Sequence, residues 1–576
     1  MTANFFRSTF GRLTIAGLVA IGLILAIDSF AAGPPTSYTG ELVKGHADYF
    51  QKLESKEFAY LRLANGQRIK LDAKEPSAIA AIPTGSEVKV TGEESDGTVV
   101  VDPEKGGEVD VRKPIEEPPA DRPLKTAIIL YNYANDQRTP YTPEQVRQTF
   151  FGGSENVNAY YKSISGNKVG YTGKDRPDGD VFGYYTIDKP NECSDENAFG
   201  GWQEAADRAA DAAGVDRAAY DRVVLVSPAV DCRGLGGLGQ IGGPESWLNG
   251  DYILDWRVTG HEQGHNFGFF HADGLKCADA AGKPVMIAPP EQCQSKEYND
   301  PFDIMGYGAA RPGVPDRAAL GRILTTKWLQ PGQIVDLTKS GTYTIFSLSG
   351  TATGPVTLRA KVFADDAGSL VEYFYVDYRS GFPYDTDKQL PQLYQGPLVR
   401  VGYELHDPST PLVPTGTILV DTAPETETFA DAPLLPGREF EYAPLGLKIK
   451  TLSVTENDAT VEVTLTPPAT PGTPPGPELP RKVPGAPINL PAPSTVATAP
   501  PRTFATNVPS PGTLVAARAA SPSPRAATPE SPPPSQTGLA KVLGDIGTVN
   551  LVVTLLALAG LVGLVIGLRQ WLARRE

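Results

Sequence analysis

Apolar and polar positions alternate with period two through the N-terminal part of the chain. Segments 58–63 and 68–71 alternate in this way on either side of Asn65-Gly66, a dipeptide that favours a hairpin turn. Segments 87–90 and 98–101 add two more such runs. We therefore expect residues 34–111 to form a small all-β module, either a barrel or a meander. It is a candidate prodomain, inhibitor or binding module, or a stabilising appendage.

Between residues 124 and 330 the pattern changes to apolar runs mixed with amphipathic segments. The runs at 125–131 and 223–226 predict buried strands. Thr142-Pro143-Glu144-Gln145 predicts a helix start, with a capping threonine, a proline at the first helical position and a capping-box glutamine. Further helices are expected at 156–164, 202–213 and 255–267. This mixture predicts an α+β domain, joined to the N-terminal module by a Pro- and charge-rich linker at 112–123 that a processing protease could reach.

The pattern beyond this domain predicts strands and then a long unfolded tract. Runs at 370–378, 397–403 and 459–465 suggest that residues 341–466 form a β-sandwich. Its aromatic residues could bind substrate or carbohydrate, or simply form its core. The next segment, 467–540, reads as a disordered stalk, because residues 467–536 hold 21 of the chain's 54 prolines.

Both ends of the chain carry apolar segments typical of export and membrane insertion. Residues 1–32 resemble a signal peptide, with two arginines, a short apolar run at 13–27 and small residues before a cleavage site, although an uncleaved N-terminal anchor would look similar. Residues 549–568 are long and apolar enough to cross a bilayer. The arginines in the tail, 569–576, predict that this end is cytoplasmic and that the rest of the chain is extracellular. We therefore expect a single-pass cell-membrane protein.

Length, charge and cysteines narrow the picture further. A chain of 576 residues is too long for one core, and a net charge of −15 argues against nucleic acid as a partner. The four cysteines suit an exported protein and allow three pairings. The pairing of nearest neighbours in sequence joins Cys193 to Cys232 and Cys277 to Cys293; four free thiols are the alternative.

Three of the chain's five histidines fall in one motif, His261-Glu262-Gln263-Gly264-His265-Asn266-Phe267-Gly268-Phe269-Phe270-His271. On a helix, His261 and His265 lie one turn apart and project from the same face. Gly268 can take a left-handed conformation, end the helix and return the chain so that His271 joins them. Three imidazoles and one open position are the layout of a catalytic Zn²⁺ site.

The pattern H-E-x-x-H-x-x-G-x-x-H is the zinc signature of the metzincins. Met305 lies in the segment Asp300-Pro301-Phe302-Asp303-Ile304-Met305-Gly306, which fits the methionine turn of that class; ordinary core filling is the alternative role for Met305. Together with segments 157–161, 181–187 and 246–250, these motifs resemble the gametolysin-like metzincins. The resemblance covers residues 124–330 well and extends loosely to about residue 466. It departs from the family at 315–322, which leaves the substrate preference open.

The resemblance implies a secreted zinc endopeptidase that acts on cell-wall glycoprotein, and hence a protein or glycoprotein substrate. Glu262 would take a proton from water and deliver it to the leaving amine. Tyr307, two residues after Met305, could ligate the metal, stabilise the oxyanion or merely pack. A catalytically weak adhesin or a carbohydrate-binding protein on a metzincin scaffold is the alternative function.

Latency by a cysteine ligand is not expected, because no cysteine precedes Cys193. If the N-terminal module inhibits the enzyme, it must cover the site or supply another ligand, and His46 is the sole imidazole available there.

Overall fold

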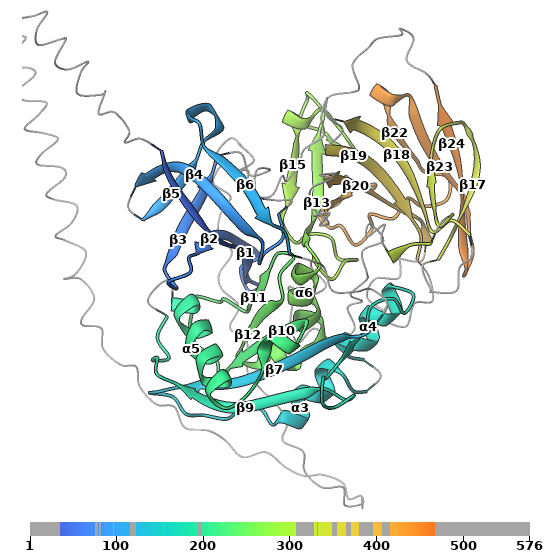
Figure 1. Cartoon of the computed structure of the whole chain (residues 1–576). Coiled ribbons are helices and arrows are strands. Elements are labelled where there is room, and N and C mark those ends of the chain that lie inside the picture. Colours follow the sequence, from blue (N-terminus) through green and yellow to red (C-terminus); the bar gives the residue numbers. More distant parts are fainter. Residues whose placement is uncertain are drawn as a thin grey trace, which may run out of the picture. The chain divides into compact units, whose positions relative to one another are not determined.

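The computed structural model describes residues 35–74, 79, 82–95, 97–115, 122–153, 155–193, 198–306, 328–330, 332–347, 354–364, 370–379, 395–405 and 415–466. The chain divides into two compact units, residues 1–492 and 493–576, and all described residues belong to the first. This part is mostly β, with few helices and several sheets (Figure 1). It contains no helix that is long and apolar enough to span a membrane. The expected signal peptide, stalk and transmembrane segment lie outside the described residues.

The N-terminal module is a closed barrel, coloured blue in Figure 1. The hairpin predicted around Asn65-Gly66 is present, with Gly66 at a φ of +82°. The ring closes because the first strand pairs with both the second and the fourth, and the third pairs with the fifth. Its strands are β1 (Thr36–Tyr49), β2 (Glu54–Arg62), β3 (Arg68–Ala73), β4 (Glu87–Ser95), β5 (Thr98–Val101) and β6 (Glu108–Lys113).

A mixed sheet with helices on both faces follows. Its strands are β7 (Leu124–Tyr133), β8 (Tyr171–Thr172), β9 (Asp180–Ile187), β10 (Arg222–Ser227), β11 (Gly237–Gln240) and β12 (Glu245–Asn249). Its helices are α3 (Pro143–Phe150), α4 (Val157–Ile164), α5 (Ala198–Ala212) and α6 (Trp256–Asn266). The strand order is β11-β12-β10-β7-β8, with β9 also on β7, and β10 runs parallel to β7 and β12. The capping box predicted at Thr142 and Gln145 starts α3.

The apolar runs in β7 and β10 are explained by burial of both faces of this sheet. Ile128 and Leu130 belong to a core shared with α3, α4 and α6. Ile129 and Leu225 point the other way, into a core shared with α5. A strand covered on both faces needs apolar side chains at consecutive positions, so the runs are continuous rather than alternating.

The third region consists of two sheets that enclose a common apolar core. One sheet has the order β14-β13-β21-β20-β19-β18-β16, with β15 on β13, and the other has the order β17-β24-β23-β22. The strands are β13 (Phe269–Ala278), β14 (Pro284–Val285), β15 (Cys293–Lys296), β16 (Ile334–Asp336), β17 (Gly341–Phe346), β18 (Thr357–Ala364), β19 (Leu370–Asp377), β20 (Leu398–Leu405), β21 (Thr415–Val420), β22 (Glu439–Tyr442), β23 (Leu447–Val454) and β24 (Asp458–Leu465). Strand β13, which follows α6 directly, pairs in parallel with β21. The segment that carries the motif therefore continues into the sandwich.

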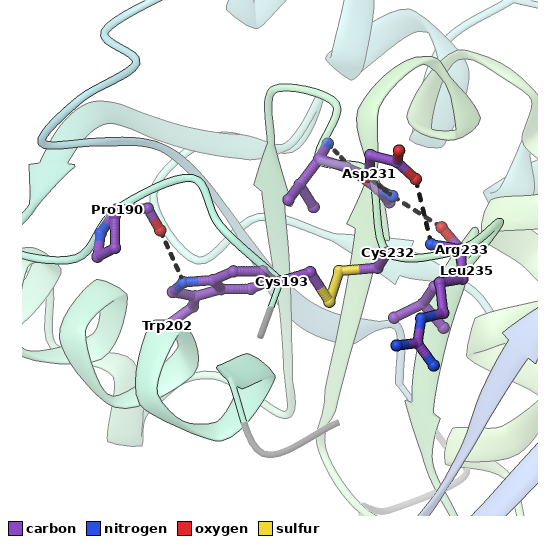
Figure 2. The surroundings of a disulfide bond; sticks show 9 residues. Pro190, Cys193, Trp202, Asp231, Cys232, Arg233 and Leu235 are labelled. Atoms are coloured by element: carbon purple, nitrogen blue, oxygen red, sulfur yellow. Dashed lines mark hydrogen bonds between the residues drawn. A yellow bond between two sulfur atoms is a disulfide. The ribbon is translucent and has the colours of Figure 1, made fainter. Parts of the chain in front are cut away.

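Both disulfides of the sequence-local pairing are formed. Cys193 bonds to Cys232 beside α5, where Trp202 Nε1 donates a hydrogen bond to the carbonyl of Pro190 at 3.1 Å (Figure 2). Cys277 bonds to Cys293 directly across β13 and β15. The second disulfide closes the hairpin that begins with the strand carrying His271.

Candidate metal centre

Helix α6 carries the first two histidines of the motif through the interior of the protein. Asp255 caps its first turn by accepting a hydrogen bond from Arg257 N at 3.0 Å, and every residue from Val258 to Asn266 is buried. The helix lies close against β11 because that strand is rich in glycine. A Cβ at Gly239 would fall 2.6 Å from Cβ of His265. The glycines of β11 thus allow α6 to bring His261 and His265 up to the edge of the sheet.

Gly268 follows the end of helix α6 and turns the chain, as the motif predicts. Its φ is +85°, and its N–H donates to the carbonyl of His265 at 2.8 Å. The chain then enters β13, which places the His271 ring 5.2 Å from that of His261 and 5.1 Å from that of His265. The three histidines of the motif therefore meet at one point.

In each of the three histidines, the ring nitrogen Nδ1 contacts a hydrogen-bond acceptor. His261 Nδ1 lies 2.7 Å from the carbonyl of Ile304, and His265 Nδ1 lies 2.7 Å from the carbonyl of Phe269. His271 Nδ1 lies 3.0 Å from a carboxylate oxygen of Glu297. A carbonyl can only accept, so Nδ1 carries the proton and Nε2 presents a lone pair. Such ring orientation is what a metal-binding histidine requires.

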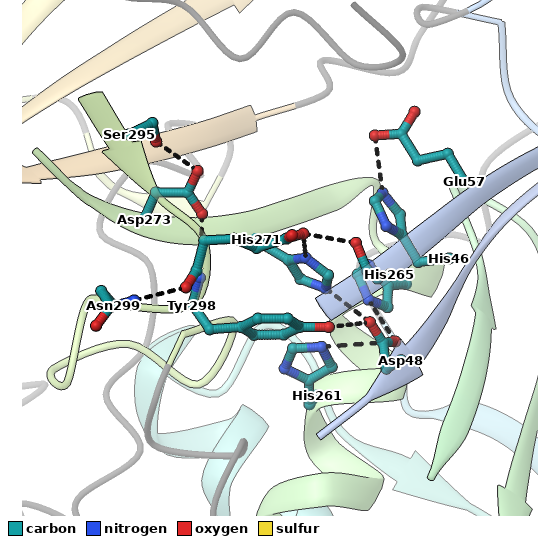
Figure 3. A network of polar contacts seen from close by, with 12 residues as sticks. His46, Asp48, Glu57, His261, His265, His271, Asp273, Ser295, Tyr298 and Asn299 are labelled. Carbon is teal, nitrogen blue, oxygen red and sulfur yellow. Dashed lines mark hydrogen bonds and ion pairs between the residues drawn. The ribbon is translucent and has the colours of Figure 1, made fainter. Parts of the chain in front are cut away.

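The three Nε2 atoms converge on the carboxylate of Asp48, which comes from β1 of the barrel (Figure 3). His271 Nε2 is 2.9 Å from Asp48 Oδ1, and Asp48 Oδ2 is 3.3 Å from His265 Nε2 and 3.8 Å from His261 Nε2. All four donor atoms lie within 4.8 Å of one another. Ligands about 2.1 Å from a tetrahedral zinc are about 3.4 Å apart, so this spacing fits such an ion.

Burial sets the electrostatics of the cluster. It lowers the pKa of His261 and of His265, and so favours the neutral rings that ligate metals. For Asp48 burial alone would raise the pKa, but the nearby His271 and His265 outweigh it and hold the pKa well below its usual range. Asp48 thus faces a position that suits a cation.

Glu262 lies beside this cluster on α6. Its side chain is fully buried, and it lies so close to Gly237 of β11 that a Cβ there would collide with its carboxylate. Burial first, and then the charge of Asp48, raise the pKa of Glu262 well above its usual value. A carboxyl group with a raised pKa next to a metal position can both take and return a proton.

Tyr298 is a further member of the site. Its ring centroid is 4.1 Å from that of His271, and its hydroxyl donates to Asp48 Oδ1 at 2.5 Å. The residue has a φ of +60°, an unusual conformation for a side chain of this size. Tyr307, the tyrosine expected here from the sequence, lies outside the described residues.

Met305 is fully buried directly below α6, where its sulfur lies against Gly264. Its turn is fixed from within, since Met305 N donates to Asp303 Oδ1 at 2.8 Å and Met305 O accepts from Ala272 N at 3.0 Å. It is also fixed from the sandwich, where Arg400 donates to Asp300 Oδ2 at 2.8 Å. The carbonyl that orients His261 belongs to this turn, so the sandwich helps to place a metal-facing ring.

Asp48, Tyr298 and Glu297 were missed from the sequence. The one available signal was His46, the expected imidazole of the module. In the structure the ring of His46 stacks on His265 at 4.8 Å and its Nε2 lies 3.7 Å from Glu57, while the carboxylate of Asp48 faces the metal position. Asp48 is two residues further along the same strand, and side chains two apart share a face. Alternation along 42–49 places Asp48 on the same face as His46, but it does not place that face at the metal position.

A sequence match accompanies this arrangement and supports a metallopeptidase. Residues 125–280 match the model of the gametolysin peptidase M11 family. This part of the chain is gametolysin-like, as the resemblance of its motifs indicated.

Other comparisons add little. No curated protein matches the chain. The crystal structure of wild-type OgpA from Akkermansia muciniphila is 10% identical, covers 54% of this chain and 96% of its own, and has a TM-score of 0.25. That of catalytically inactive OgpA from the same organism with an O-glycopeptide substrate, glycodrosocin, is 11% identical, covers 51% and 91%, and has a TM-score of 0.23. At such TM-scores the likeness says nothing about function.

Proposed function

We propose that the chain is a zinc-dependent endopeptidase of the cell surface that hydrolyses peptide bonds in extracellular or cell-wall proteins, glycoproteins included. The observation that carries the proposal is the convergence of three buried Nε2 atoms on one position next to Glu262. Among the described residues, their own domain supplies three ligands, which leaves a place for a reacting group once Asp48 is absent.

Zinc is the metal that the donor set favours. Three neutral imidazoles suit Zn²⁺ better than the oxygen-seeking Mg²⁺ or Ca²⁺. A zinc ion held by His261, His265 and His271 would polarise the scissile carbonyl and make a water molecule more acidic.

The other residues of the site would handle the proton and the developing charge. Glu262 would accept the proton of the attacking water and pass it to the leaving amine, a role that its buried position beside the three histidines supports. The Tyr298 hydroxyl, which now donates to a carboxylate oxygen at the metal position, would donate to the substrate oxygen that takes its place. Tyr307 remains a candidate for the same task.

The surface location rests on the sequence. The signal peptide at 1–32 and the apolar segment 549–568 would place the described residues outside the cell, held off the membrane by the Pro-rich stalk. Two disulfides are in keeping with an oxidising compartment.

The test uses the full-length chain with a specific protease site introduced within 116–121, so that the barrel can be cut from the rest. We expect about one zinc per chain and hydrolysis of a casein-type substrate after cutting, lost on chelation and restored by zinc. Glu262→Gln should keep its zinc and lose about two to four powers of ten in turnover. The matched control is Glu144→Gln on α3, where the side chain is 62% exposed.

Two outcomes would contradict the proposal. A cut chain without bound zinc would remove the metal centre. A cut chain that binds zinc and hydrolyses nothing would favour the adhesin or carbohydrate-binding alternative. Near-normal turnover in Glu262→Gln would reject only the role of that carboxylate.

A further inference from the structure

Strand β1 joins the barrel to the mixed sheet, so that their strands form one continuous twelve-stranded sheet. Its C-terminal half pairs with β2 of its own barrel and also runs antiparallel to β11, with Gly45 opposite Gln240 and Asp48 opposite Gly237. Gly236 N donates to Asp48 O at 2.8 Å, and Ile241 N donates to Lys44 O at 3.0 Å. Without β1, β11 would be the edge strand of the sheet, since the order continues β12-β10-β7. The barrel therefore fills the edge next to the metal centre.

One face of β1 covers the histidines. Positions 46 and 48 share that face, because side chains alternate along a strand, and Phe50 follows directly after the strand. The His46 ring stacks on that of His265 at 4.8 Å, and the Phe50 ring meets that of His261 edge-on at 5.3 Å. Asp48 lies between these two side chains in sequence, and its carboxylate reaches the point where the three Nε2 atoms converge.

The position of Asp48 is that of a ligand. Its side chain is 0% exposed, and a carboxyl group in such a place needs a cation or strong hydrogen bonds to offset its burial. Its oxygens lie 2.9, 3.3 and 3.8 Å from the three Nε2 atoms, around the separation of about 3.4 Å between tetrahedral zinc ligands. Carboxylate oxygen is one of the donors that zinc accepts in proteins.

We propose that Asp48 is a fourth protein ligand of the metal and that residues 35–115 form a latency module whose strand β1 occupies the place of an extended peptide substrate. The proposal rests on the proposed function. Addition of a strand to a sheet edge is a general mode of peptide recognition. Once β1 has left, a substrate would therefore run antiparallel to β11 along Gly237–Gln240. The chain stays inactive until β1 leaves, after a cut in the 112–123 linker.

The device differs from a cysteine switch, in agreement with the sequence. All four cysteines of the chain are paired with one another. The ligand from the module is a carboxylate, and it comes from Asp48 and not from the imidazole of His46.

The experiment compares Asp48→Asn and Asp48→Ala with the parent, all as full-length uncut chains. Asp110→Asn is the matched control, since it removes a carboxylate from the same barrel where the side chain is 47% exposed and paired with Arg112. Each chain is loaded with Co²⁺, whose visible spectrum reports the number and type of ligands. Transfer of the metal to a chelator is then timed.

We expect both Asp48 variants to change the cobalt spectrum and to release metal at least about tenfold faster than the parent. Loss of a group that only hydrogen-bonds to a metal ligand typically lowers metal affinity about tenfold or more, and loss of a ligand itself should cost no less. The control should match the parent. Uncut Asp48→Ala should also hydrolyse peptide at least about tenfold faster than the uncut parent, because without its metal ligand β1 is held less tightly and leaves the edge of β11 more often.

The proposal is overturned if both Asp48 variants keep the spectrum and the release rate of the parent. Asp48→Asn preserves the side-chain shape, so its cobalt spectrum and its rate of metal release test the proposal even if Asp48→Ala fails to fold. Thermal unfolding would reveal such a failure. A parent chain that binds no cobalt would overturn the ligand and the proposed function together. A changed spectrum in the Asp48 variants with an inactive cut parent would support the ligand and reject the peptidase.

Discussion

The buried ion pair between the sandwich and the Met305 turn gives a prediction whose size can be worked out. Arg400 on β20 donates to Asp300 Oδ2 at 2.8 Å and to Asp377 Oδ1 at 2.6 Å. The three side chains are 4%, 0% and 2% exposed, respectively. Arg400→Met keeps much of the apolar volume but leaves Asp300 buried without its cation, and it leaves Asp377 with Arg379 alone, at 3.6 Å. The free energy of unfolding should therefore fall by much more than for a surface ion pair.

Removal of one partner from a buried ion pair costs about 3–5 kcal/mol. This cost corresponds to about two to three and a half powers of ten in the ratio of folded to unfolded chain. The matched control is Arg359→Met on β18, which loses a pair with Asp336, a residue 58% exposed. That change should cost about 1 kcal/mol or less. Because Asp300 also anchors the turn by accepting from Phe302 N at 2.8 Å, Arg400→Met should release metal faster as well.

Urea unfolding followed by tryptophan fluorescence measures both variants against the parent, and a chelator measures metal release. A further chain, in which Arg400→Met is combined with Asp300→Asn, should regain part of the lost stability because residue 300 then carries no unpaired buried charge. Equal losses in Arg400→Met and Arg359→Met would refute the reasoning. So would a stable Arg400→Met chain that holds its metal as the parent does.

Three further outcomes are expected. Tyr298→Phe should lower kcat of the cut chain by about ten- to a hundredfold with little change in KM, measured beside Tyr307→Phe; unchanged kcat would return Tyr298 to packing. Burial, reinforced by Glu245, raises the pKa of Asp207 from 3.8 to about 7, so the stability from this group is full below its ordinary pKa and is lost as pH rises through about 7. Asp207→Asn should flatten the fall in urea midpoint between about pH 4 and pH 7, and an unchanged slope would contradict this. Added zinc should raise the melting temperature of the metal-free parent and not that of His265→Ala, whereas equal shifts would place the metal elsewhere.

The local features of the fold were predictable because their causes are local. The hairpin at Asn65-Gly66 follows from turn geometry, and the start of α3 follows from its capping box. The three motif histidines come together because helical spacing and the left-handed Gly268 act within eleven residues. None of these steps requires knowledge of a distant segment.

The remaining features depend on contacts between distant segments. Asp48 reaches His271 only because β1 pairs with β11, and nothing in the residues around position 48 specifies that partner. The same is true of β13 and β21, whose pairing carries the motif segment into the sandwich. The position of Tyr298 beside His271 could not be predicted, because it depends on how the chain returns towards the histidines after β15. Pairing of distant strands has no short-range signature, so the fourth group at the metal position could not be read from the zinc motif.

The central claim, a zinc centre held by three histidines, is tested most directly by X-ray absorption at the zinc edge of the full-length protein. We predict three imidazole ligands and one oxygen ligand, at about 2.0–2.2 Å, and loss of one imidazole in His271→Ala. Zinc that is bound through sulfur, or through fewer than three imidazoles, or not at all, would contradict the account.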